Sequence, residues 1–219
     1  MNEAYLVAFD MDGTLIPIRS SWEFVHRLLG TEKTALRYRR MYERGEIDYR
    51  RWAELDVASW RGKDFSKVIG EVERLEPLED AVEAVGMLKS HGFIVGIISS
   101  GLNIVADRLC SRLEMDFCRS AELIIVGNEV RGIIEELEPE RKADELARVA
   151  REFGVPLRRV AFVGDGESDL SVFRMRIGRK IAFRPASQLI VSLADHVVDS
   201  LMEAARILVE WKGSGGIEP

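Results

Sequence analysis

The pattern of hydrophobic and polar positions from residue 75 onward predicts strands that alternate with helices. Residues 93–98 and 160–163 are continuous apolar runs, as are residues 6–9 near the N-terminus. Short runs of this kind are typical of strands buried on both faces of a parallel sheet. Residues 180–183 and 196–198 are predicted as the last two strands. The alternation predicts an α/β fold with a doubly wound, mostly parallel sheet.

Apolar positions at helical spacing predict the helices between these strands. In residues 78–90 the apolar stripe includes Ala81, Val85 and Leu88, and the segment ends at His91-Gly92, where glycine suits a left-handed cap. The other helices predicted in this part of the chain are 103–113, 142–153 and 201–211.

Two segments depart from this alternation. Residues 122–135 hold two β-rich runs joined through Gly127-Asn128, which predicts a β-hairpin at the edge of the sheet. Residues 17–74 are rich in charge and in helix formers and have no convincing strand, which predicts a helical insertion. Because the insertion directly follows the loop that contains Asp10 and Asp12, we expect it to lie over that loop as a lid.

The predicted insertion is rich in aromatic residues. We expect most of these rings to form the core of the insertion itself, with one or two of them facing the loop beneath. The rings considered are those of Trp22, Trp52, Trp60, Tyr38, Tyr42 and Tyr49.

Composition narrows the class of protein. A chain of 219 residues with 47% hydrophobic content can hold one α/β domain with an insertion, or two small domains. The net charge of −6 gives no indication of a nucleic-acid partner. We find no basic, apolar leader before the first predicted strand and no apolar run long enough to span a membrane. We therefore expect no nucleic-acid and no membrane partner, and a cytoplasmic location. Asparagine and glutamine are rare in the sequence, whereas Glu and Arg are frequent, and this composition indicates a thermophilic source.

The two cysteines, Cys110 and Cys118, lie in a stretch that we predict to be helical and without a cysteine motif. With no Cys-x-x-Cys spacing and no histidine cluster, the sequence gives no support for a zinc site.

Asp10 and Asp12 follow the first apolar run and are the first candidate site residues. Alternation along a strand would put both carboxylates on one side, close enough to share a cation, at the edge of the sheet where ligands bind. Aspartates in this position also cap helices or shape turns. A calcium loop is excluded, because Leu15 and Ser21 stand where that loop needs Gly and Glu.

Two further strand ends carry polar groups. Ser99-Ser100-Gly101 follows the run 93–98 and is interpreted as a turn that opens a helix, offering either N–H groups to an anion or a simple cap. Asp165 and Asp169 follow the run 160–163, and Asp169 replaces the third glycine of a dinucleotide fingerprint, which excludes that motif.

Lys142 begins a predicted helix, where a cation opposes the helix dipole, so a role toward a ligand is considered.

The four aspartates Asp10, Asp12, Asp165 and Asp169 would repel one another if they meet. Charges ~5 Å apart at an effective dielectric of ~20 repel by roughly 3 kcal/mol per pair. Some carboxylates must then be protonated, or a cation must bind. All-oxygen ligands favour Mg²⁺, and together with the lysine they are typical of a phosphoryl-transfer site.

These motifs, in order, resemble the four motifs of the haloacid dehalogenase superfamily, and the inserted helices resemble its phosphoserine phosphatase-like branch. The matching residues are Asp10-Met11-Asp12-Gly13-Thr14, Ser99, Lys142 and Gly164-Asp165-Gly166-Glu167-Ser168-Asp169. The resemblance implies a Rossmann-like core from residues 1–16 and 76–219, with a helical cap from residues 17–75. It also implies a Mg²⁺-dependent phosphatase that acts on a small phosphate monoester.

The resemblance assigns a role to each matching residue. Asp10 would be the nucleophile that forms an aspartyl-phosphate, and Asp12 the general acid and then the base. The implied metal ligands are Asp10, Asp165 and the backbone carbonyl of Asp12, with Asp169 holding a metal-bound water or Lys142. The implied phosphate-binding residues are Gly13, Ser99, Ser100 and Lys142.

Two positions depart from the phosphoserine phosphatase pattern. Arg19 stands where that branch has a Glu for the substrate amine, and Asp56 stands where it has an Arg for the substrate carboxylate. Both charges would repel phosphoserine, so we expect a different preferred substrate. Arg19 is expected either to bind a second anionic group or to pair with Asp56.

Two other classes stay open. A phosphotransferase or phosphomutase of the same superfamily would pass the phosphoryl group to an acceptor other than water. A receiver-like signalling module would accept the group and stop, although the insertion and Asp12 argue against it. The pattern specifies neither the acceptor nor an oligomeric state.

Overall fold

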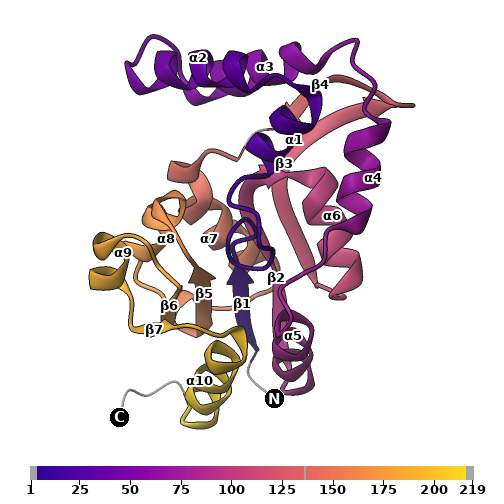
Figure 1. Cartoon of the computed structure of the whole chain (residues 1–219). Coiled ribbons are helices and arrows are strands. Elements are labelled where there is room, and N and C mark those ends of the chain that lie inside the picture. The colour runs from indigo at the N-terminus through magenta and orange to yellow at the C-terminus, as the bar shows by residue number, and fades with distance from the viewer. Residues whose placement is uncertain (1–3, 136, 216–219) are drawn as a thin grey trace.

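The computed structural model describes residues 4–135 and 137–215, and it contains a seven-stranded sheet with helices on both faces (Figure 1). The strands lie in the order β4-β3-β2-β1-β5-β6-β7, and every neighbouring pair is parallel except β3 and β4. The strands are β1 Tyr5–Phe9, β2 Phe93–Leu102, β3 Phe117–Val126, β4 Glu129–Glu135, β5 Val160–Gly164, β6 Arg179–Phe183 and β7 His196–Val198. The predicted doubly wound sheet is confirmed.

Strand β1 lies at the centre of the sheet between β2 and β5. Its side chains alternate between two hydrophobic clusters: Tyr5, Val7 and Phe9 pack into one, and Leu6 and Ala8 into the other. Every residue of this strand is buried, which explains why the sequence has an apolar run there instead of an alternating pattern.

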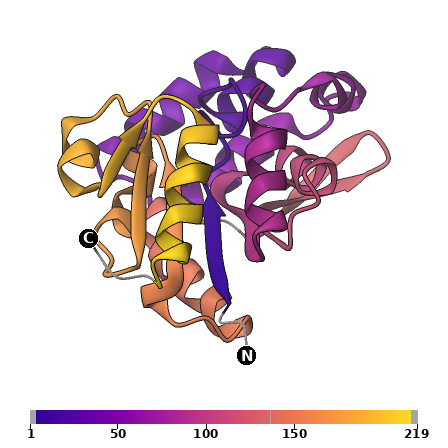
Figure 2. The same ribbon diagram turned by 90° about the horizontal axis from the view of Figure 1, so that it is seen from below.

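The helices of the core cover both faces of the sheet. Helices α5, α6 and α10 belong to the cluster on one face, where α5 and α10 lie side by side (Figure 2). Helices α7, α8 and α9 pack on the other face. Their bounds are α5 Ala81–Ser90, α6 Asn103–Arg112, α7 Lys142–Glu152, α8 Leu170–Phe173, α9 Gln188–Leu193 and α10 Leu201–Gly213. Three short 3₁₀ turns are η1 Pro139–Arg141, η2 Leu157–Arg159 and η3 Glu167–Asp169.

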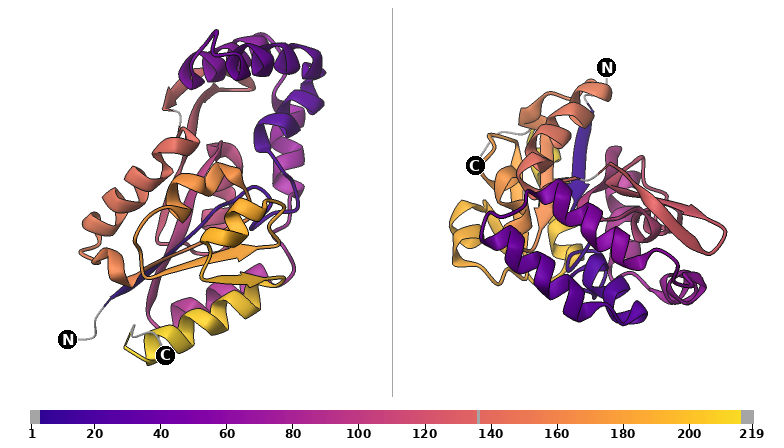
Figure 3. Two further views of the ribbon diagram at one scale, coloured as in Figure 1. Left: turned by 90° about the vertical axis from the view of Figure 1, so that its left-hand side faces the viewer. Right: turned by 90° about the horizontal axis from the view of Figure 1, so that it is seen from above.

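The segment between β1 and α5 is helical, as predicted. It comprises α1 Ser21–Leu29, α2 Glu32–Glu43, α3 Tyr49–Trp60 and α4 Ser66–Arg74. Viewed from above, α2 and α3 lie across the carboxyl ends of the strands (Figure 3). The fully buried Trp60 packs against Trp22 and Phe65 within this segment. Hydrophobic contacts thus continue from the sheet into the helices above it.

The predicted edge hairpin is present and supports the helical segment. Strands β3 and β4 are antiparallel and are joined through Gly127, whose φ of 61° lies in the left-handed region. At the turn, the N–H of Phe65 donates to the carbonyl of Asn128 at 2.8 Å, and β4 packs against α3. The hairpin therefore reaches from the core to the inserted helices.

Two local expectations are wrong. Strand β2 continues to Leu102 with an irregular register after Ile98, so Ser99-Ser100-Gly101 ends a strand and does not open the helix, which begins at Asn103. Cys118 lies in strand β3 and forms a disulfide with Cys110 of α6. The helix ends two residues before Glu114, whose φ of 51° turns the chain back toward the sheet.

In the described part of the chain, no helix is both long and apolar enough to cross a membrane.

Candidate active site

Asp10 lies at the carboxyl end of the central strand and is 2% exposed. Its N–H donates to the carbonyl of Val163 at the end of β5, at 2.9 Å, which fixes the two strand ends together. The chain then turns sharply, since the carbonyl of Met11 accepts from the N–H of Leu15 at 2.9 Å. Gly13 has a φ of 78°, and a Cβ there would collide with the carboxylate of Asp165. Only glycine fits this loop.

The ammonium group of Lys142 joins two buried aspartates. It donates to Oδ1 of Asp10 at 2.9 Å and to Oδ1 of Asp169 at 2.7 Å, and all three side chains are at most 3% exposed. Burial alone would lower the pKa of Lys142, but the two carboxylates raise it above its usual range. Lys142 is therefore a buried, permanent positive charge beside Asp10.

Asp10, Asp165 and Asp169 form an acidic cluster in which one oxygen of each lies within 4.8 Å of the others. The hydroxyl of Thr14 lies 3.4 Å from Oδ1 of Asp165. Burial and the neighbouring Asp10 raise the pKa of Asp165 to about 6. A single lysine does not neutralise three carboxylates, so the site favours a proton or a cation. A donor set made only of oxygens fits a hard divalent ion such as Mg²⁺.

The carboxylate of Asp12 lies outside this cluster. Its Oδ2 accepts from both the N–H and the hydroxyl of Ser21, at 2.7 and 2.8 Å, while Oδ1 is buried and has no hydrogen-bond partner among the described residues. Burial raises the pKa of Asp12 to about 7, against the lowering effect of Ser21. Strand alternation does not extend to Asp12 because β1 ends at Phe9 and the loop turns the side chain toward the helical segment.

Ser99 and Ser100 lie near the end of β2, which is the parallel neighbour of the strand that precedes Asp12. The Ser99 hydroxyl is buried and accepts from the N–H of Gly101 at 3.1 Å. The Ser100 hydroxyl is buried and has no hydrogen-bond partner in the described part of the chain, whereas its carbonyl accepts from Trp22 Nε1 at 2.9 Å. A Cβ on Gly101 would collide with the side chains of Met11, Asp12 and Ser21. The structure thus brings two unpartnered polar atoms, Ser100 Oγ and Asp12 Oδ1, to the same strand ends.

Arg19 and Asp56 are not brought together. Arg19 is exposed, whereas Asp56 is 4% exposed and lies 3.3 Å from Nε2 of the buried His26. Trp60 Nε1 donates to Nδ1 of His26 at 3.1 Å, so Nε2 carries the ring proton that faces Asp56. The expected pairing of Arg19 with Asp56 is wrong, because α3 turns Asp56 inward toward α1.

Sequence reasoning missed three residues of this region. Thr14 contacts Asp165, Ser21 holds Asp12 and also accepts from the N–H of Leu102 at 3.0 Å, and Trp22 holds the Ser100 carbonyl. Thr14 lies in the first motif, Asp10 to Thr14, so its place in that motif could have indicated a role at the site. Ser21 and Trp22 carry no such signal, because their contacts depend on how the first inserted helix packs on the core.

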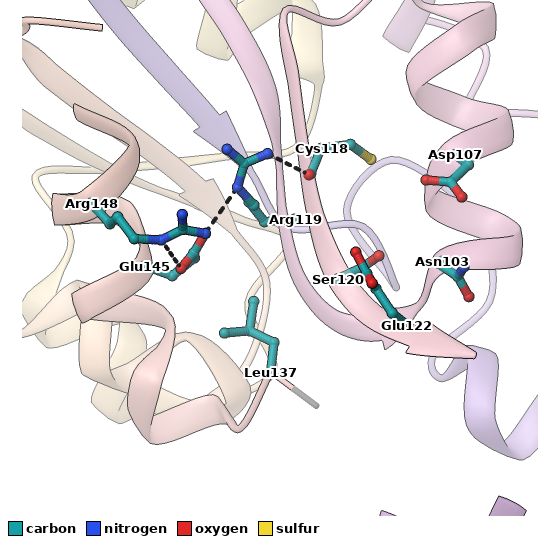
Figure 4. Close-up of a pocket in the computed structure, with 9 residues that line it drawn as sticks. All are labelled: Asn103, Asp107, Cys118, Arg119, Ser120, Glu122, Leu137, Glu145 and Arg148. Carbon is teal, nitrogen blue, oxygen red and sulfur yellow. Dashed lines mark hydrogen bonds and ion pairs between the residues drawn. The ribbon is translucent and has the colours of Figure 1, made fainter. Parts of the chain in front are cut away.

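A cavity of about 240 Å³ lies next to strand β3, away from the acidic cluster (Figure 4). Its lining includes Asp107 of α6, Arg119 and Ser120 of β3, and Glu145 and Arg148 of α7. Arg119 and Arg148 each pair with both Glu145 and Glu152, so the two positive and two negative charges on that side balance one another. None of the four candidate aspartates lines this cavity.

Comparison with known proteins identifies the family. The family model of haloacid dehalogenase-like hydrolases matches residues 6–175. The chain belongs to the haloacid dehalogenase-like hydrolases. It is 28% identical over 180 residues to a phosphoserine phosphatase of Methanocaldococcus jannaschii, covering 81% of this chain and 84% of that protein. It is 30% identical over 212 residues to a phosphoserine phosphatase of Archaeoglobus fulgidus, covering 94% of this chain but 60% of that protein.

Solved structures agree with this assignment. A substrate-bound phosphoserine phosphatase complex is 25% identical to this haloacid dehalogenase-like hydrolase, with a TM-score of 0.79 over 94% of this chain and 99% of the other. The expected family, its phosphoserine phosphatase-like branch and the fold are confirmed, as is the enzyme class, a phosphoric monoester hydrolase.

Proposed function

We propose that this protein is a Mg²⁺-dependent phosphatase that hydrolyses a small phosphate monoester through an aspartyl-phosphate on Asp10. The observation that carries the proposal is the contact of Lys142 Nζ with Oδ1 of Asp10, at 2.9 Å, inside a buried acidic cluster. A carboxylate held beside a fixed positive charge is suited to approach a phosphate anion, because the lysine offsets the repulsion between the two anions.

In the first step, a carboxylate oxygen of Asp10 forms a bond to phosphorus as the bond from phosphorus to the substrate oxygen breaks. The leaving oxygen takes the proton of Asp12, whose pKa of about 7 keeps part of the population protonated at neutral pH. Lys142 and the hydroxyls of Ser99 and Ser100 bind the phosphoryl oxygens, and the backbone of Gly13 leaves room for them. The products are the free alcohol and the aspartyl-phosphate.

In the second step, Asp12, now ionised, takes a proton from water as the water oxygen attacks phosphorus. The bond between phosphorus and Asp10 breaks, inorganic phosphate leaves, and both aspartates return to their starting states. An acid and base in this position favours turnover over a module that stops at the phosphorylated state. Hydrolysis is preferred to phosphotransfer because the relatives that the chain resembles are phosphatases.

The metal would be held by carboxylate oxygens of Asp10 and Asp165 and by the backbone carbonyl of Asp12. Asp169 would orient Lys142 and water around it. Bound Mg²⁺ supplies charge neutralisation for the phosphoryl oxygens during transfer. We assign residues 1–16 and 76–219 to a catalytic core and residues 17–75 to a cap.

Hydrolysis of an aryl phosphate with and without Mg²⁺, together with Asp10→Asn, tests the proposal. The variant loses activity by at least about 10⁴-fold, because it lacks the nucleophile. Asp144→Asn, an exposed aspartate on α7, is the matched control and keeps wild-type activity. Mass spectrometry of quenched enzyme detects the phosphate on Asp10 and not on Asp12. Activity that survives in Asp10→Asn contradicts the mechanism.

A further inference from the structure

Helix α1 begins with two consecutive residues that hold the end of strand β2. The indole Nε1 of Trp22 donates to the carbonyl of Ser100 at 2.9 Å. The hydroxyl of Ser21 accepts from the N–H of Leu102 at 3.0 Å and donates to Oδ2 of Asp12 at 2.8 Å. The first turn of the inserted segment is therefore fixed to the core at a strand end that Ser21 also joins to the proposed acid and base.

The Ser100 carbonyl lies close to Asp12. Ser100 is bonded to Gly101, where a Cβ would lie 2.8 Å from Oδ2 of Asp12. Four covalent bonds separate that Cβ position from the Ser100 carbonyl oxygen, so the oxygen lies within about 8 Å of Oδ2. A substituent on the second carbon of a substrate alcohol falls in the same range, because Asp12 contacts the ester oxygen in the proposed mechanism.

Trp22 covers the Ser100 carbonyl from the side of the inserted helices. Its ring packs against the fully buried ring of Trp60, with centroids 5.6 Å apart, so the indole has support on both sides. Under the proposed function, the alcohol part of the substrate lies between these helices and the strand ends. A carbonyl oxygen has two lone pairs, but the indole approaches this one from the side on which the alcohol lies.

The other polar groups of this strand end are already engaged. The Ser99 hydroxyl accepts from a backbone N–H at 3.1 Å, and both donors of Ser21 go to Oδ2 of Asp12. In the proposed mechanism, the Asp12 carboxyl serves the ester oxygen and the Ser100 hydroxyl serves the phosphate. The Ser100 carbonyl is thus the acceptor that a substrate ammonium would need here, and the indole N–H occupies it.

Two charged positions that were considered for the substrate do not replace this acceptor. Asp56 is 4% exposed and lies 3.3 Å from Nε2 of His26, and Arg19 is exposed and positively charged. An ammonium group that leaves water needs an acceptor, because a buried charge without a partner is costly. A hydroxyl or methyl group in the same place has no net charge, so its cost is smaller.

We propose that Trp22 determines specificity: its indole N–H occupies the Ser100 carbonyl, so the enzyme prefers phosphate monoesters of uncharged alcohols. This inference rests on the proposed phosphatase function and names its substrate class. The phosphate lies at Lys142, and the uncharged alcohol lies against the indole ring. An ammonium group on the carbon next to the ester carbon, as in phosphoserine, is disfavoured.

Three esters of equal size test the substrate class. They are 2-hydroxyethyl phosphate, phosphoethanolamine and propyl phosphate, which end in a hydroxyl, an ammonium and a methyl group. We expect kcat/KM for phosphoethanolamine to be at least ~10-fold lower than for either neutral ester, mostly through KM. Phosphoserine is also expected to be slower than 2-hydroxyethyl phosphate.

The outcomes separate this inference from the phosphatase function. Equal rates for the three esters, or a preference for phosphoethanolamine or phosphoserine, overturn the inference and leave the phosphatase function intact. An enzyme that hydrolyses none of the esters, an aryl phosphate included, overturns both.

Trp22→Phe locates the recognition, because it removes the indole N–H and keeps a ring. The Ser100 carbonyl can then accept from an ammonium group, so discrimination against phosphoethanolamine should fall below ~3-fold through a lower KM for that ester. Trp211→Phe, the same exchange on α10 at the other end of the sheet, is the matched control and keeps the discrimination (Figure 1). Calorimetry of phosphoethanolamine binding to Asp10→Asn, with and without Trp22→Phe, gives a readout independent of turnover. Discrimination that persists in Trp22→Phe contradicts the assignment to Trp22.

Discussion

Ser21 donates both its N–H and its hydroxyl hydrogen to one oxygen of Asp12, at 2.7 and 2.8 Å. Ser21 is the first residue of helix α1, whereas Asp12 belongs to the loop that follows β1. The same hydroxyl accepts from the N–H of Leu102 at the end of β2. One side chain of the helical segment therefore fixes the proposed acid and base against the core, and a movement of α1 would also move the Asp12 carboxylate.

Ser21→Ala is expected to lower kcat by about 10-fold with little change in KM, because Asp12 loses one of two hydrogen bonds and its orientation loosens. The hydroxyl of Ser21 also lowers the pKa of Asp12, so the pH profile of the variant shifts upward. Steady-state kinetics from pH 5 to pH 9 measure both effects.

Ser20→Ala is the matched control for this change. The Ser20 side chain caps α1 by accepting from the N–H of Glu23, whereas the hydrogen bonds to Asp12 in the described part of the chain come from Ser21. Its replacement should reduce the free energy of unfolding by about 1 kcal/mol without altering the pH profile. A Ser21→Ala enzyme that matches Ser20→Ala in every kinetic parameter contradicts the positioning role.

Two half-buried aspartates predict how the metal-free protein responds to pH. Folding raises the pKa of Asp12 from 3.8 to about 7 and that of Asp165 from 3.8 to about 6. The folded state therefore binds more protons than the unfolded state between about pH 4 and pH 7, and the free energy of unfolding falls as pH rises through this window. Thermal unfolding in the presence of a chelator should give a lower Tm at pH 8 than at pH 5.

Mg²⁺ should reverse this loss, because it replaces the protons as the neutralising charge. At 100 times its dissociation constant, a ligand of the folded state stabilises by about 2.7 kcal/mol. Asp165→Asn removes one carboxylate, so it should flatten the pH dependence and reduce the Mg²⁺ response. A metal-free wild-type protein that is more stable at pH 8 than at pH 5 is inconsistent with the acidic cluster.

Lys142 is expected to be as important for folding as for activity. Lys142→Met leaves Asp10 and Asp169 buried and adjacent without a partner, which should cost about 3–5 kcal/mol of unfolding free energy at pH 8. The loss should be smaller at pH 5, where one carboxylate can take up a proton. Denaturant unfolding at the two pH values measures it. The double variant Lys142→Met with Asp169→Asn is the control and should recover stability but not turnover.

The sequence predicted the sheet because its strands are buried on both faces, so runs such as residues 6–9 and 160–163 are apolar without interruption. It also placed Asp10 and Asp165 at the carboxyl ends of strands in one sheet, and in the structure they meet because β1 and β5 are parallel neighbours. These conclusions depend only on local pattern and on general rules of sheet geometry.

Contacts made by the helical segment could not be predicted in this way. The side chain of Ser21 reaches Asp12 because α1 packs on the end of β2, and Asp56 faces His26 because of the rotation of α3. Neither packing has a periodic signal in the sequence. The charge of Asp56 indicated a role toward the substrate, but in the fold its carboxylate faces the buried ring of His26.

Asp56 is therefore expected to affect stability rather than substrate selection. Asp56→Ala removes the carboxylate that lies 3.3 Å from the buried Nε2 of His26, which should reduce the free energy of unfolding by about 1–3 kcal/mol. The ratio of kcat/KM between phosphoserine and other monoesters should stay unchanged. Arg19 is exposed and does not pair with Asp56 as one expectation had it, so Arg19→Ala should leave the free energy of unfolding unchanged. A changed substrate preference in Asp56→Ala contradicts this interpretation.

The disulfide between Cys110 and Cys118 joins α6 to β3, eight residues apart in sequence. Closing a loop of this length stabilises by about 2–3 kcal/mol through the unfolded state, so reduction should lower the Tm by about 5–10 °C. Thermal unfolding with and without dithiothreitol measures the shift, and peptide mapping under non-reducing conditions identifies the bond. Cys110→Ser is the matched control, since its Tm should be lower and insensitive to the reductant. Two freely titrating thiols in the oxidised, folded protein would show that the bond does not form.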